Sequence, residues 1–103
     1  MNLTGYSHIS VWVKASAPHT FRFLLDNGTA TDPTAERRFG INVAVTETNV
    51  WQEILLPLSP VTGWTRAEGG TLDIAVVGGW MFAQNAFPVG ATFHLGPIMA
   101  VNR

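Results

Sequence analysis

The sequence predicts an all-β domain, a jelly-roll β-sandwich of two antiparallel sheets with little or no helix. Short segments in which apolar and polar residues alternate recur along the chain, and this is the period of a half-buried strand. Turn-forming Gly, Pro, Asn and Asp residues separate the segments. No window carries apolar residues at helical spacing over two turns. A chain of 103 residues can bury one core but not two, so a single domain over residues 1–103 is expected.

The first two strands are predicted at 6–15 and 21–26. In the first, aliphatic residues alternate with polar ones, and Trp12 has the parity of the polar set. We therefore expect Trp12 on the face opposite the core. A turn containing Pro18 leads into the second strand, in which three large apolar residues share one face.

Three more strands are predicted in the middle of the chain, set apart by polar loops at 29–36 and 60–70. Gly40 in the third strand either relieves crowding or marks a bulge. Pro57 places the fourth strand at a sheet edge, because proline has no N–H for a ladder. The predicted ranges are 38–45, 51–58 and 72–76, the last stopping at Gly78-Gly79.

The aromatic-rich segment 80–88 has neither strand nor helix period, and we predict a loop that folds back onto the sandwich. The last strand begins near Thr92, slips register at Gly96-Pro97 and continues to Ala100. The apolar residues that share one face of each predicted strand then form the predicted core. It contains Val11, Phe23, Val43, Ile54, Leu56, Ile74 and Phe93.

Charge and composition argue against several classes of partner. The net charge is −1 and the basic residues form no stripe, so nucleic acid is not an expected partner. The apolar runs fall far short of the roughly eighteen residues that span a bilayer, and the N-terminus does not resemble a signal peptide. With no cysteine, the chain has no disulfide and no thiolate site. Only 13% of residues are charged, which is typical of a surface that something covers.

No catalytic residue, metal site or cofactor is predicted. No spacing brings two carboxylates together across a cleft, and Gly-x-Ser-x-Gly and glycine-rich phosphate loops are absent. His8 and His94 have parities that allow one shared face, but solvated histidines are the commoner outcome. One alternative stays open, a single cation held by Asp26, Asp32 and Glu36.

The order of these features carries a family resemblance. The stretch HISVWVKASAP at 8–18, followed by the strand that ends at Asn27-Gly28, resembles the first hairpin of carbohydrate-binding-module-like (galactose-binding-like) jelly rolls. His19 stands where such hairpins have glycine. The segments 51–58 and 92–98 are more similar to the version of this domain found in bacteriophage virion and tail-associated proteins. The enzyme-linked modules often carry acidic residues where this chain has Gly96 and Pro97, so the calcium ligand expected there is missing.

The resemblance implies a non-enzymatic bacteriophage virion protein, a capsid- or tail-associated module that forms a symmetric homo-oligomer and contacts other virion proteins. A trimer is the expected stoichiometry. The alternative is an extracellular, soluble carbohydrate-binding module that stacks tryptophans on the sugar rings of a cell-surface glycan. Relatives commonly have further strands before the first one here, so either this is a minimal jelly roll or a neighbouring chain completes the sheet edge.

Aromatic residues on the outer face and in loops are the candidate contacts, because they need a reason to be ordered. The outer face around Trp12 could also be covered by loops, and the loop aromatics could plug the end of the sandwich. We expect Trp51 to be a lid over the core. The residues predicted to contact a ligand or a neighbouring subunit are Trp12, Trp64, Trp80, Phe82 and Phe87.

Overall fold

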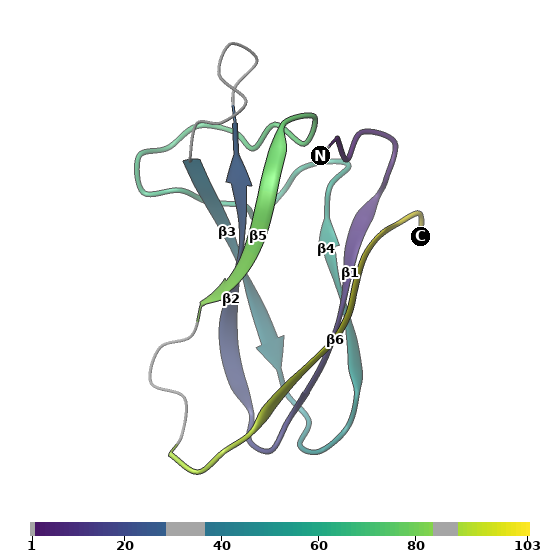
Figure 1. The fold of residues 1–103 in the computed structure, drawn as a ribbon, viewed down its shortest axis with the longest axis vertical. Coiled ribbons are helices and arrows are strands. Elements are labelled where there is room, and N and C mark those ends of the chain that lie inside the picture. The colour runs from purple at the N-terminus through teal and green to yellow at the C-terminus, as the bar shows by residue number, and fades with distance from the viewer. Residues whose placement is uncertain (1, 29–36, 84–88) are drawn as a thin grey trace.

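The computed structural model describes residues 2–28, 37–83 and 89–103, and within them it confirms the all-β prediction. Two antiparallel three-stranded sheets face each other (Figure 1). The described residues contain no helix, and so none that could cross a membrane. Sheet A has the order β4-β1-β6 and sheet B the order β3-β2-β5. The strands are β1 His8–Ala15, β2 His19–Asn27, β3 Arg37–Val45, β4 Gln52–Pro57, β5 Val77–Ala83 and β6 Phe93–Val101.

Five of the six strands lie where the alternation predicts them, to within two residues at each end. β4 is an edge strand, as Pro57 requires. The predicted register slip is also present, because Leu95 pairs with Val13 and Ile98 with Val11, which leaves Gly96 and Pro97 opposite the single residue between them.

The prediction for the fifth strand is wrong. Residues 72–76 form loop and turn, while β5 comprises Val77–Ala83, including the two glycines that were expected to end a strand and part of the segment expected to be a loop. The reason lies in the buried side chain of Asn27 at the end of β2. Its Nδ2 donates to the carbonyls of Asp73 and Val76, each at 2.8 Å, and its Oδ1 accepts from the Asp73 N–H at 2.9 Å.

These hydrogen bonds hold 72–76 as a compact turn against β2, and the backbone groups that they pair need no neighbouring strand. Leu72 is still buried and Ile74 half-buried. The turn therefore imitates the apolar alternation of a strand, which is why the sequence pattern misplaces this element.

Gly40 is in β3 and relieves crowding, one of the two roles predicted for it. A Cβ there would overlap Nε of Arg22, whose guanidinium crosses the glycine and donates to Oγ1 of Thr65 at 2.7 Å. Thr65 also exchanges two backbone hydrogen bonds of 2.8 Å with Gly40. The loop 60–70 is thereby attached to the free edge of β3.

The core lies between the two sheets and contains Val11, Phe23, Val43 and Leu56, as parity predicts. Ile54, Ile74 and Phe93 are only partly buried and pack against that core, which corrects their predicted burial. Ile54 and Phe93 belong to edge strands and Ile74 to the turn, so each has fewer neighbours than a residue of a central strand.

The strand order shows on which side an eight-stranded jelly roll would have two further strands. It equals the order of the last six strands of an eight-stranded jelly roll, and the two further strands of that fold flank the equivalents of β6 and β5. β3 approaches both β1 and β4 on the opposite side. In Figure 1 the side between β5 and β6, which we call the open side, is nearest the viewer.

Candidate functional site

The open side holds an apolar cleft between the sheets, with a volume of about 250 Å³. Its floor is formed by Ile9 of β1 and by Phe23 and Leu25 of β2, all buried core residues. Trp80 on β5 and Ile98 on β6 line its two edges. The cleft is therefore a part of the core that the described strands leave uncovered. We call it the open-side cleft.

Trp80 belongs to the inner face of β5, where it pairs with Leu25. Its indole stacks on the ring of Phe23, with centroids 5.9 Å apart and planes inclined by 11°. It is nevertheless 46% exposed, because β5 is an edge strand and no described strand lies beyond it. One large aromatic side chain is thus anchored to the core on one face and presented to solvent on the other.

Phe82 pairs with Phe23 two residues further along the same face of β5. Its ring lies 5.4 Å from that of Phe23 and 5.6 Å from that of Phe93 on β6, so it joins the two sheets. Phe82 is half-buried, and the prediction that it lies in a loop is wrong. Leu95 on β6 pairs with Val13, a core residue, and is still 39% exposed.

Trp64 is separate from the open-side cleft. It is 7% exposed, its Nε1–H donates to the carbonyl of Pro57 at 2.7 Å, and the edge of its ring meets Phe23. This placement agrees with the plug interpretation of the loop tryptophan. Phe87 and the acidic residues Asp32 and Glu36 lie outside the described residues.

Trp12 and Trp51 lie together on the outer face of sheet A. Trp12 pairs with Glu53 and is half-buried opposite the core, as predicted. Trp51 directly precedes β4 and is 46% exposed, so the prediction of a core lid is wrong. A Cβ on Gly96 would lie 2.9 Å from Cβ of Trp12 and 3.0 Å from Cζ3 of Trp51, so both tryptophans reach the β6 bulge. Trp51 precedes Glu53 by two residues, so the alternation of the sequence already places both on the outer face, which the lid interpretation overlooked.

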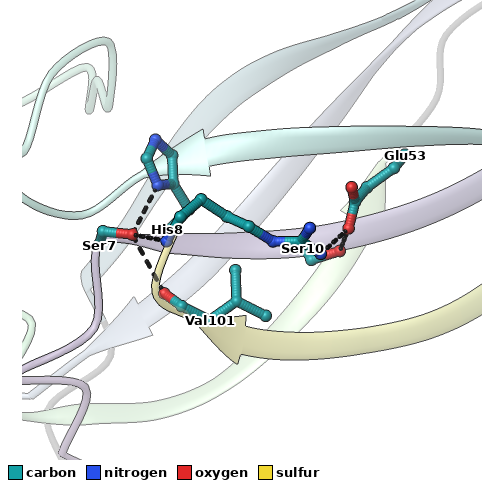
Figure 2. Close-up of polar contacts among 6 residues, drawn as sticks. Ser7, His8, Ser10, Glu53 and Val101 are labelled. Atoms are coloured by element: carbon teal, nitrogen blue, oxygen red, sulfur yellow. Dashed lines mark hydrogen bonds and ion pairs between the residues drawn. The ribbon is translucent and has the colours of Figure 1, made fainter.

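A polar network covers the same face nearer the chain ends. Ser10 is fully buried, and its Oγ donates to Oε2 of Glu53 at 2.6 Å (Figure 2). The guanidinium of Arg103 forms an ion pair with the same carboxylate oxygen. The backbone N–H of Arg103 donates to Oγ of Ser7. Ser7 also bonds to Nδ1 of His8 at 2.8 Å. The network fastens β1 to β4 and to the last residues of the chain.

The remaining titratable residues form no cluster for chemistry among the described positions. His8 and His94 share the outer face of sheet A. His8 is itself in β1, whereas His94 in β6 pairs with Lys14, six residues further along β1. The two histidines are therefore roughly 20 Å apart. Asp26 forms an ion pair with Arg38 at 2.9 Å. No group of three or more His, Asp or Glu that could hold a metal occurs in the described residues.

The chain was also compared with protein-family models, curated proteins and solved structures, and none of the three comparisons found a match. The chemistry of the surface must therefore carry the functional argument.

Proposed function

We propose that this protein is a non-enzymatic structural module that assembles into a symmetric oligomer through its open side, as a capsid- or tail-associated component of a bacteriophage virion. The observation that carries the proposal is the open-side cleft, where an indole anchored to the core meets solvent between two strand edges. Monomeric surfaces rarely keep such a feature uncovered.

The energetic reason lies in the exposed part of Trp80. A tryptophan side chain offers up to about 250 Å² of surface, so the 46% left exposed is roughly 115 Å². At about 25 cal/mol per Å², covering it stabilises a complex by on the order of 3 kcal/mol. A partner chain over the open side would gain this free energy, which offsets part of the entropy lost on association.

The virion setting is supported by the resemblance of two segments, 51–58 and 92–98, to phage tail-associated domains. They coincide with β4 and β6, which flank β1 in sheet A. The low share of charged residues, 13%, also suits a module whose surface is shared with other proteins.

Native mass tests the proposal directly. Sedimentation velocity should give an oligomer at micromolar concentration, and acrylamide should quench Trp80 emission only after dilution dissociates it. A variant carrying Trp12→Phe, Trp51→Phe and Trp64→Phe isolates the Trp80 signal. A protein that stays monomeric at every concentration would contradict the proposal.

A second candidate function, carbohydrate binding, is favoured by the outer face of sheet A. The exposed indole of Trp51 lies across Gly96, with the ring of His94 at 6.5 Å, and aromatic faces flanked by hydrogen-bonding groups suit sugar rings. Trp51→Ala should then abolish polysaccharide retention in affinity electrophoresis while Trp80→Ala preserves it. Equal mobility of wild type and Trp51→Ala in every polysaccharide tested would exclude this use of the surface.

A further inference from the structure

The four sheet edges differ in how they are protected from pairing with another chain. Unprotected edges invite strand addition, and natural proteins block them with charged residues, prolines, bulges or covering loops. β3 begins with Arg37 and Arg38 and is bridged by Thr65. β4 carries Glu53 and Pro57. β6 contains Pro97 at its bulge.

Among the described residues, β5 has no charged side chain, no proline and no covering loop, and its only bulge lies at its first residues. Its sequence, VGGWMFA, has no charged residue and no proline, and it pairs regularly with β2 from Gly79 to Ala83. Its one register shift lies at the start, next to Val77. Within the described residues no strand lies on its other side. In the part of the chain that the structure describes, the backbone N–H and C=O groups of that side pair with no strand and are open to a further one.

We propose that β5 pairs with β5 of a second copy of this chain, antiparallel and about a twofold axis, so that two copies of sheet B become one six-stranded sheet. The inference rests on the proposed function, because it names the partner and the edge through which the oligomer forms. A twofold axis is the symmetry that makes two identical strands antiparallel neighbours.

Self-pairing fits the side chains of β5 on both faces of the sheet. On the inner face, Trp80 and Phe82 would continue the apolar surface into the partner's open-side cleft. On the outer face, Met81 is 37% exposed beside Leu24, and it too would meet uncharged residues. Because β5 carries no charge, no like charges oppose each other in any register. A second copy is therefore a self-complementary occupant.

Single-cysteine cross-linking tests the pairing, since the natural chain has no cysteine. Gly79→Cys, Met81→Cys and Ala83→Cys sample one face of β5 and are oxidised alone and in mixed pairs. At least one combination should give an inter-chain disulfide, because only residues directly opposite come within bonding distance. Ala44→Cys is the matched control, an exposed alanine position on β3 at the far edge of the same sheet. It should stay reduced.

A charge on the edge supplies the second measurement. Met81→Lys should weaken self-association at least tenfold by sedimentation equilibrium, whereas Leu55→Lys, which alters a side chain of similar exposure on β4, should leave it unchanged. Thermal melts of both variants establish that each remains folded.

The outcomes separate this inference from the function on which it rests. An even-numbered oligomer that cross-links within β5 and is weakened by Met81→Lys supports both. A trimer, or an oligomer that tolerates Met81→Lys and does not cross-link in β5, overturns the β5 pairing and leaves the structural function standing. A wild-type protein that is monomeric at all concentrations overturns both.

Discussion

At the scale of single residues, Asn27 decides the path of the chain after the long loop. It is fully buried at the end of β2, and its amide hydrogen bonds reach residues more than forty positions away in the sequence. A buried amide is stable only when it is paired, and here both its nitrogen and its oxygen have backbone partners. The turn 72–76 depends on those bonds.

We predict that Asn27→Ala lowers the free energy of unfolding by about 1–3 kcal/mol, because the N–H of Asp73 loses its acceptor, while the carbonyls of Asp73 and Val76 keep only their backbone donors. Urea titration followed by circular dichroism measures the loss. Asn42→Ala, at an exposed position of β3, is the control and should change the free energy by less than about 0.5 kcal/mol. Equal effects of the two substitutions would refute the assigned role of Asn27.

At the scale of elements, sheet B depends on a close contact between β2 and β3. Arg22 crosses Gly40 to reach Thr65, so one glycine gives room to the side chain that attaches the loop 60–70. A methyl group at Gly40 would overlap the guanidinium, which would have to leave its hydrogen bonds with Thr65.

Gly40→Ala should therefore move the flexible end of Arg22 off Thr65, destabilise the protein by about 0.5–1.5 kcal/mol, and expose the loop to proteolysis between residues 60 and 70. Gly79→Ala is its matched control, a strand glycine with no atom near the added methyl group. It should leave stability unchanged or raise it slightly. Thermal melts and limited digestion with trypsin, which can cut after Arg66, distinguish the two variants. Unchanged digestion of Gly40→Ala would contradict the contact.

Alternation along the sequence was enough to place five strands and the outward side of Trp12, because each of these depends on neighbours within one strand. β5 could not be placed in this way. Residues 72–76 and 77–83 both carry apolar side chains toward the core, and the bonds of Asn27, made across a long stretch of chain, decide which of them pairs. The same limit applies to Trp64, whose burial requires the carbonyl of Pro57.

At the scale of the whole molecule, charge has a small part in holding the protein together. The net charge is −1, and in each described ion pair at least one partner is well exposed, as with Arg38 and Asp26. Such pairs contribute about 0–1 kcal/mol each. Both folding and the proposed association must then rest mainly on apolar burial.

Salt should therefore have little effect on assembly. Raising sodium chloride from about 0.05 to 1 M should leave the dissociation constant of the oligomer unchanged or lower it, since screening acts on charges and not on apolar contact. Sedimentation equilibrium at both concentrations measures this, with circular dichroism as the control for folding. A tenfold weakening at high salt would show that the contact is electrostatic.

The strand order also determines how the chain can fold. Among the described strands only β2 and β3 are neighbours both in a sheet and along the chain, whereas β1 pairs with β4 and with the last strand, β6. Pairings between distant segments require the closure of long loops, so folding should be slow, in the millisecond-to-second range of such topologies. On a ribosome the β2–β3 hairpin can form early, but β1 must wait with its apolar face uncovered until β4, and finally β6, has left the exit tunnel.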